Sequence, residues 1–124
     1  MILGTGIDII EVHRVAEKVN KENGFREKVF SEYEIAYCEK TADAAQHYAA
    51  RFAAKEAFLK AGGGGLLSGY DLNEIEIQHD DQGKPRIFLT GTFKALANQN
   101  GWNKIHVSLS HVQAMACAVV IIEQ

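Results

Sequence analysis

Residues 44–61 have the sequence AAQHYAARFAAKEAFLKA, the longest stretch of strong helix formers in the chain. Alanine, leucine, lysine and glutamate cost little in a helix interior, so this stretch predicts one long helix. Asp43 precedes it and is expected to cap its first turn, while the glycines at 62–65 end it.

Before the long helix, the pattern predicts a strand and further helices. Residues 3–10 are apolar and rich in isoleucine, as in a buried strand. Residues 11–21 repeat apolar side chains at the spacing of an amphipathic helix. A short turn of helix over 25–30 and a helix over 32–39 follow, and Ser31 with Glu34 has the spacing of a capping box.

After the glycines, the apolar side chains alternate instead. Residues 72–78 and 86–89 predict a hairpin around a turn at 80–85, a helix from residue 90 or 91 to 97 follows, and residues 105–110 and 114–122 predict two more strands. The predicted fold class is α+β. We expect a compact single domain over residues 1–124, with a largely antiparallel sheet and the long helix packed against it.

Composition narrows the classes of function. A formal net charge of −3 on 124 residues gives no global signal for nucleic-acid binding. The longest apolar stretch, 114–122, is far shorter than the roughly 20 residues of a membrane helix. Cys38 and Cys117 form no CxxC pair and no signal peptide is visible, which favours a reduced, cytoplasmic setting. A chain this small also gains from oligomerisation.

Two carboxylates stand in unusual surroundings. Asp8 lies within the apolar strand, where a charge is costly unless something compensates it. Glu56 lies in the long helix, one turn before Lys60 and among small or apolar neighbours. If strand and helix are adjacent, Asp8 and Glu56 can share one Mg²⁺ ion while Lys60 reaches a phosphate. Mg²⁺ commonly takes one or two carboxylates together with substrate phosphates.

These residues also have simpler explanations. Glu56 and Lys60 have the spacing of an ordinary surface ion pair along a helix. Asp8 stands near the start of the next helix and can act as its cap.

The glycine run and the histidines are ambiguous as well. The run is either a helix end with a loop, or a place where amides such as those of Gly63 and Gly64 approach a phosphate closely. It is not a P-loop, because the glycines follow a helix instead of preceding one. His111 can donate to a phosphate or close a turn. The other histidines show no metal-ligand spacing and are interpreted as structural or exposed: His13, His47, His79 and His106.

The first helix carries a short basic stripe. Arg14, Lys18 and Lys21 fall opposite its apolar face, on a chain that is slightly acidic overall. The stripe is either an ordinary solvated face or a docking surface for an acidic protein helix, for which complementary charge aids encounter.

Five segments in one order carry a family resemblance. They are GIDIIEVHR at 6–14, FSEYE at 30–34, RFAAKEAFLKA at 51–61, GKP at 83–85 and SLSH at 108–111. Together they resemble the motifs of the holo-acyl-carrier-protein synthases, the small 4′-phosphopantetheinyl transferases of fatty-acid synthesis. The resemblance covers essentially the whole chain and implies that family's fold.

The resemblance implies an enzyme that moves the phosphopantetheine arm of coenzyme A onto a serine of the apo carrier protein and leaves 3′,5′-ADP. It implies that Asp8 and Glu56 bind Mg²⁺ and that Lys60 contacts phosphate. Phosphoryl-type transfer depends mainly on positioning and on neutralising charge. Either Glu56 or Asp8, directly or through a metal-bound water, is a candidate base for the serine proton.

The resemblance also implies how coenzyme A and the partner bind. Arg51 and His111 match positions near the 3′-phosphate of coenzyme A, and Gly83 to Pro85 match positions near its adenine. Arg14 matches a carrier-protein contact. The small members of the family are trimers with active sites between subunits, so a homotrimer is expected.

Two departures from the family pattern concern the loop and one neighbour. The family usually has Ala-Leu-Gly-Thr-Gly where this chain has Ala61 followed by four glycines, and Val112 follows His111 where a polar residue is commoner. Neither departure touches the carboxylates, so we expect activity.

Two rival interpretations remain open from the sequence. One is a coenzyme A or nucleotide sensor that has no turnover, and the other is a purely structural oligomer subunit.

Overall fold

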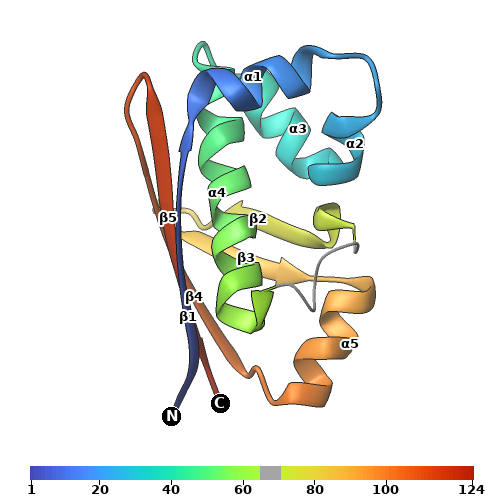
Figure 1. Ribbon diagram of the computed structural model, residues 1–124, viewed down its shortest axis with the longest axis vertical. Coiled ribbons are helices and arrows are strands. Elements are labelled where there is room, and N and C mark those ends of the chain that lie inside the picture. The colour runs from blue at the N-terminus through green and yellow to red at the C-terminus, as the bar shows by residue number, and fades with distance from the viewer. Residues whose placement is uncertain (65–70) are drawn as a thin grey trace.

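Helix α4 (Ala44–Gly62) lies at the centre of the computed structural model, which describes residues 1–64 and 71–124 (Figure 1). The predicted long helix is confirmed, and its buried side chains contribute to two hydrophobic clusters that form the core. The predicted cap is wrong: the Asp43 side chain makes no capping hydrogen bond. Its Oδ1 lies 3.2 Å from His47 Nε2 one turn later, so the carboxylate is drawn away from the helix amides.

One face of a three-stranded antiparallel sheet packs on α4. Its strands are β1 (Ile2–Glu11), β5 (Met115–Glu123) and β4 (Lys104–His111), in the spatial order β1-β5-β4. Figure 1 shows this sheet as one layer, with the described helices on a single side of it. Side chains alternate across the sheet, so Asp8 opposite Ala118 points toward α4, whereas Ile7 opposite Val119 points away from it.

The predicted hairpin forms a second, two-stranded antiparallel sheet. Its strands are β2 (Ile75–His79) and β3 (Pro85–Leu89), and α5 (Gly91–Asn100) connects them to β4. The first predicted strand was expected to start at residue 72, but η2 (Leu72–Glu74) is a turn of 3-10 helix. The α+β class with antiparallel strands and one long helix is confirmed, with the strands divided between two sheets.

Three short helices cover the start of α4. They are α1 (Val12–Asn20), α2 (Phe25–Val29) and α3 (Glu32–Glu39). The predicted capping box is present: Ser31 Oγ accepts from the Glu34 amide, and Glu34 Oε1 accepts from the Ser31 amide at 2.9 Å. This box fixes where α3 begins and places Glu34 in the core.

Two glycines let β1 lie directly on α4. A Cβ at Gly4 or Gly6 would collide with the backbone carbonyl oxygen of Ala61 or Ala57, respectively. Because Asp8 is two residues beyond Gly6 on the same face of the strand, this close approach also brings Asp8 to the helix.

Replacing Gly6 by alanine should lower the free energy of unfolding by about 1–3 kcal/mol, because an added methyl group cannot be accommodated without moving the strand. Urea denaturation measures the effect. The control is Thr5→Ala at the neighbouring exposed position, which should change stability by no more than about 0.5 kcal/mol. Equal stabilities of the two variants would show that strand and helix do not pack this closely.

Candidate active site

Asp8 and Lys60 meet where β1 crosses the last turns of α4. Lys60 Nζ donates to Asp8 Oδ1 at 3.1 Å and to the Ile7 carbonyl oxygen at 3.0 Å. The Asp8 side chain is 16% exposed and that of Lys60 is 55% exposed, so a ligand can reach the pair. Of the two simpler explanations, the Asp8 cap is not formed, because α1 begins without a side-chain cap, and the ion pair that Lys60 makes is with Asp8.

Glu56 lies close enough to Asp8 for the two charges to interact. Burial raises the pKa of the Glu56 carboxyl, and the Asp8 carboxylate raises it further, while Lys60 and Lys18 lower it. A pair of repelling carboxylates beside one lysine suits a hard divalent cation, which would relieve the repulsion.

The donor set fits Mg²⁺ better than a metal that needs a full protein shell. Within residues 1–64 and 71–124, no group of three or more His, Cys, Asp or Glu side chains is placed to hold a metal ion. Mg²⁺ keeps several waters and binds through one or two carboxylates and substrate phosphates. Asp8 and Glu56 supply that number of carboxylates.

The glycines at the end of α4 follow Lys60 directly. Gly63 and Gly64 have φ values of 126° and 67°, a region that favours glycine. A Cβ at either position would meet none of the described atoms within 4 Å, so this backbone is open. Contact between these amides and a phosphate stays a prediction, and Gly65 lies outside the described residues.

Four other predicted residues surround one cavity on a different side of α4. Arg51, Gly83, Pro85 and His111 line a cavity of about 160 Å³ between α4, the turn after β2 and the end of β4. Arg51 precedes Glu56 by five residues, which turns its side chain by about 140° around the helix axis. The structure thus brings these predicted site residues together in two groups, which lie on different sides of α4.

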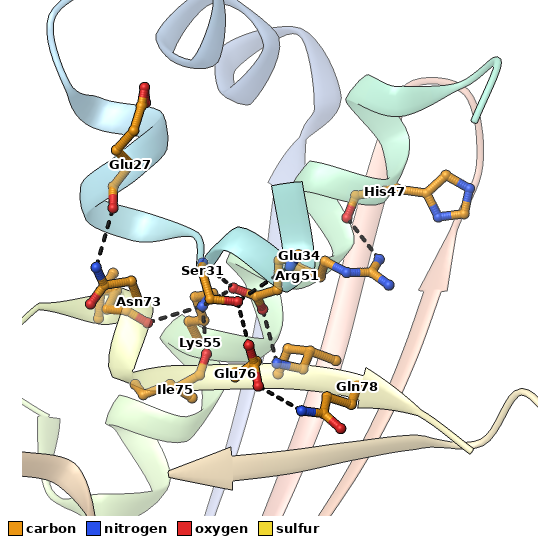
Figure 2. Close-up of polar contacts among 12 residues, drawn as sticks. Glu27, Ser31, Glu34, His47, Arg51, Lys55, Asn73, Ile75, Glu76 and Gln78 are labelled. Atoms are coloured by element: carbon orange, nitrogen blue, oxygen red, sulfur yellow. Dashed lines mark hydrogen bonds and ion pairs between the residues drawn. The ribbon is translucent and has the colours of Figure 1, made fainter. Parts of the chain in front are cut away.

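Arg51 is almost completely buried beside this cavity. Its Nη1 donates to the His47 carbonyl oxygen at 3.2 Å, a contact drawn in Figure 2, and its Nη2 donates to His79 Nδ1 at 3.2 Å. The guanidinium carbon lies 4.3 Å from the centre of the Tyr37 ring. A buried permanent cation at a cavity wall indicates an anionic ligand.

Three further residues of this cavity were missed from the sequence. His47, His79 and Tyr37 line it together with Arg51, although the two histidines were expected to be merely structural or exposed. Burial lowers the pKa of both imidazoles, and the Arg51 charge lowers each of them as well. The spacing of four residues between His47 and Arg51 was a signal in the sequence, but Tyr37 and His79 come from other elements and join them only in the fold.

A buried ion pair fixes α4 against the hairpin. Lys55 Nζ donates to Glu34 Oε1 at 2.8 Å and to the carbonyl oxygens of Leu72 and Ile75, and both charged side chains are fully buried (Figure 2). Glu34 Oε2 also accepts from the Ile77 amide at 2.9 Å. These contacts join α3, α4, η2 and β2. They centre on Lys55, which directly precedes Glu56 in the sequence.

The network continues toward the surface through polar side chains. Ser31 Oγ donates to Glu76 Oε1 at 2.6 Å, and Gln78 Nε2 donates to Glu76 Oε2 at 2.6 Å (Figure 2). The capping-box spacing identified Ser31 and Glu34 from the sequence, but it gave no sign of Lys55 as their partner. The hairpin that carries His79 is therefore held to α4 by charge-assisted hydrogen bonds.

The basic stripe of α1 is exposed and lies near the carboxylates. Arg14, Lys18 and Lys21 are all exposed, although Lys21 follows the last residue of the helix. Lys18 Nζ lies 5.9 Å from the centre of the Phe52 ring, which precedes Glu56 by one turn of α4. A partner docked on this stripe would thus stand beside Glu56.

Comparison with known proteins identifies the family. The model of the 4′-phosphopantetheinyl transferase superfamily matches residues 4–120. A holo-[acyl-carrier-protein] synthase of Syntrophus aciditrophicus is 46% identical over 124 residues, which cover 99% of this chain and 97% of the relative. The chain belongs to the holo-acyl-carrier-protein synthase family of this superfamily. The predicted resemblance and the prediction of an enzyme are confirmed.

Solved structures of the family share the fold. A holo-[acyl-carrier-protein] synthase from Neisseria meningitidis has a TM-score of 0.89 at 30% identity, with all of both chains covered. One from Bacillus anthracis, in complex with CoA (3′,5′-ADP), has a TM-score of 0.79 at 32% identity over 98% of this chain and 96% of that one. The family fold therefore extends over the two groups of residues described above.

The sequence was expected to contain no membrane-spanning helix. Among the described residues, no helix combines the length and apolar character needed to cross a bilayer.

Proposed function

We propose that this chain transfers the 4′-phosphopantetheine group of coenzyme A to a serine of apo acyl carrier protein, releasing 3′,5′-ADP, in fatty-acid biosynthesis. The observation that carries the proposal is the convergence of Asp8, Glu56 and Lys60 in a chain of this family. The names of the relatives support the carrier protein as acceptor. The Bacillus anthracis complex supports coenzyme A as donor.

The chemistry follows from charge and position. Asp8 and Glu56 would hold Mg²⁺, which when bound offsets the charge on the diphosphate of coenzyme A. Lys60 adds a fixed positive charge beside the same phosphates. The serine oxygen attacks the phosphorus that carries pantetheine, and the bond from that phosphorus to the bridging oxygen breaks, so that 3′,5′-ADP leaves.

The serine hydroxyl also has to lose a proton. Glu56 or Asp8, directly or through a metal-bound water, is the candidate base for this proton. Lys18, beside Glu56, belongs to the stripe where an acidic carrier protein would dock through Arg14, Lys18 and Lys21.

Coenzyme A has to reach both groups of residues. In the proposed arrangement, Arg51 and His111 receive its 3′-phosphate, Gly83 and Pro85 contact its adenine, and the amides of Gly63 and Gly64 approach its phosphates. Arg51 and Glu56 face different sides of α4. One coenzyme A molecule therefore reaches both groups most directly when one subunit supplies the carboxylates and its neighbour supplies the cavity beside Arg51.

The outer face of the large sheet supports a homotrimer. Ile7 and Ile9 are 68% and 66% exposed, and Val119 lies opposite Ile7 on the same face. None of the described elements covers this face (Figure 1), and exposed apolar patches of this kind mark interfaces. A hollow of about 540 Å³ there is lined by Asp8 and Lys60 as well as Ile7, Ile9 and Cys117, so a subunit on this face would border Asp8 and Lys60. Light scattering should give three times the monomer mass.

We further propose that residues 1–124 are one phosphopantetheinyl transferase domain that works in the cytoplasm. Two free cysteines, Cys38 and Cys117, suit a reducing compartment.

The experiment is a mass measurement on the carrier protein. With coenzyme A and Mg²⁺, apo carrier protein should gain the mass of one phosphopantetheine, and a chelator should prevent the gain until Mg²⁺ is restored. A carrier with its acceptor serine replaced by alanine is the control. Binding of coenzyme A without any mass gain would show a sensor, and a gain that ignores the chelator would show that the carboxylates do not serve a metal ion.

A further inference from the structure

The Arg51 guanidinium is held on one edge by a histidine. Its Nη2 donates to His79 Nδ1 at 3.2 Å, its Nη1 donates to the His47 carbonyl oxygen, and its flat face lies on the Tyr37 ring. The Nε is buried and has no hydrogen-bond partner among the described residues. A guanidinium carries five N–H donors, so this arrangement leaves donors for an anionic ligand in the cavity.

The direction of this hydrogen bond fixes the state of His79. Arginine can only donate, so Nδ1 of His79 accepts and the imidazole is neutral, with its hydrogen on Nε2. The His79 ring also stacks on Tyr37, with ring centres 5.2 Å apart and planes 15° apart. His79 and Arg51 therefore contact the same aromatic ring and each other.

We propose that His79 is a positioning residue: when neutral it holds the Arg51 guanidinium at the wall of the cavity, and when a phosphate monoester binds, a proton taken up at Nδ1 ends this contact so that both cations donate to the phosphate. The inference rests on the proposed function, in which the cavity receives the 3′-phosphate of coenzyme A. To that function it adds one phosphate-binding residue, His79, which lies outside the family motifs, and it adds the uptake of one proton when the phosphate binds.

The charges around the cavity set the direction of this coupling. Burial, Arg51 and His47 lower the pKa of His79, and only Asp80 raises it, so His79 is neutral near pH 7 in the protein alone. The remaining titratable neighbours are His47, whose Nε2 lies 3.2 Å from Asp43, and His111, whose Nδ1 contacts Gln46 Oε1 at 2.8 Å. A doubly charged phosphate adds negative charge and favours the imidazolium.

The sign of the pH effect follows. The pKa of His79 is higher with the phosphate bound than without it, so binding takes up protons between these two values. The affinity for a phosphate monoester should therefore rise as the pH falls from 8 toward 7, where the phosphate, whose second pKa is about 6, is still mostly doubly charged. An analogue without the 3′-phosphate should lack this rise.

The test is calorimetric titration with 3′,5′-ADP and with 5′-AMP, which differs from it only in lacking the 3′-phosphate. Titrations at pH 7 in buffers of different ionisation enthalpy give the number of protons taken up. The wild-type protein should take up protons with 3′,5′-ADP and not with 5′-AMP. His79→Gln keeps an acceptor for Arg51 but cannot titrate, so it should bind 3′,5′-ADP almost normally at pH 8 and lose most of the proton uptake.

A second variant tests the positioning role. His79→Ala should weaken the binding of 3′,5′-ADP about tenfold, as expected for one charge-assisted hydrogen bond, and leave the binding of 5′-AMP unchanged. His106→Gln is the control, because His106 pairs with Glu123 on the large sheet and should alter neither ligand. Thermal melting of each variant confirms the fold.

Three results would overturn the inference. They are an unchanged preference for 3′,5′-ADP in His79→Ala, undiminished proton uptake in His79→Gln, and no binding of 3′,5′-ADP by the wild-type protein. The mass measurement on the carrier protein separates this failure from failure of the proposed function. Transfer that persists with an unchanged preference refutes the role of His79 alone, whereas absence of transfer refutes the function.

Discussion

Glu56→Gln and Asp8→Asn should each lower the rate of phosphopantetheine transfer by at least about 10²–10³-fold, the loss typical of removing one group that stabilises charge in the transition state. Each amide keeps the size of the side chain it replaces but removes a negative charge that would hold Mg²⁺. Initial rates from the mass of the carrier protein at saturating coenzyme A measure the effect. Raising the Mg²⁺ concentration should restore part of the activity.

The matched control for these variants is Glu32→Gln. Glu32 is an exposed acid in the first turn of α3, away from both groups of site residues, so its loss should leave transfer unchanged. The metal-free Glu56→Gln protein should melt no lower than the wild type. The pKa of Glu56 is higher in the folded protein than in the unfolded chain, so folding favours the protonated carboxyl. This contribution to stability is fully present below the ordinary glutamate pKa and is lost as the pH rises through the pKa of the folded protein. Full activity in both carboxylate variants would place the reaction elsewhere.

Lys55→Met should lower the free energy of unfolding by about 3–5 kcal/mol, the range for breaking a buried ion pair by removing one partner. The substitution leaves the Glu34 carboxylate buried without its cation and leaves the Leu72 and Ile75 carbonyl oxygens without their donor. Urea denaturation followed by circular dichroism measures the loss.

Two further variants make this prediction specific. Lys60→Met removes a lysine from the same helix, but its pair with Asp8 is partly exposed, so it should cost at most about 1 kcal/mol. Glu34→Gln/Lys55→Met removes both charges and should cost less than the sum of the single substitutions, because no unpaired buried charge remains. A Lys55→Met protein as stable as the wild type would mean that the lysine is not buried in solution.

Local patterns predicted the elements of this fold well. The composition of residues 44–61 is helical on its own, and the capping box of Ser31 and Glu34 depends on residues three apart. The Asp43 cap failed because a competing partner, His47, lies one turn further along. The strand expected from residue 72 failed because three of its residues form a 3-10 turn that presents Leu72 O to a buried lysine.

The candidate site was only partly predictable for a similar reason. Asp8 was conspicuous because an acid is costly in an apolar strand, and Glu56 lies in a motif of the family. Lys55 was not conspicuous, because a lysine in a helix is normally exposed and only the packing of α3 and β2 buries it. His47 lies one turn before Arg51 on α4 itself, but the contact of His79 with Arg51 depends on how the hairpin docks on α4.

Strand β1 carries Asp8 on the face toward α4 and exposed apolar side chains on the opposite face. Ile7 and Ile9 flank Asp8 in the sequence but project from the reverse side of the strand. In the proposed trimer, a compound that binds between subunits at these isoleucines would shift the backbone that carries the carboxylate. Because the same hollow is lined by Asp8 and Lys60, such a compound would also weaken the binding of coenzyme A, and its potency would depend on enzyme concentration.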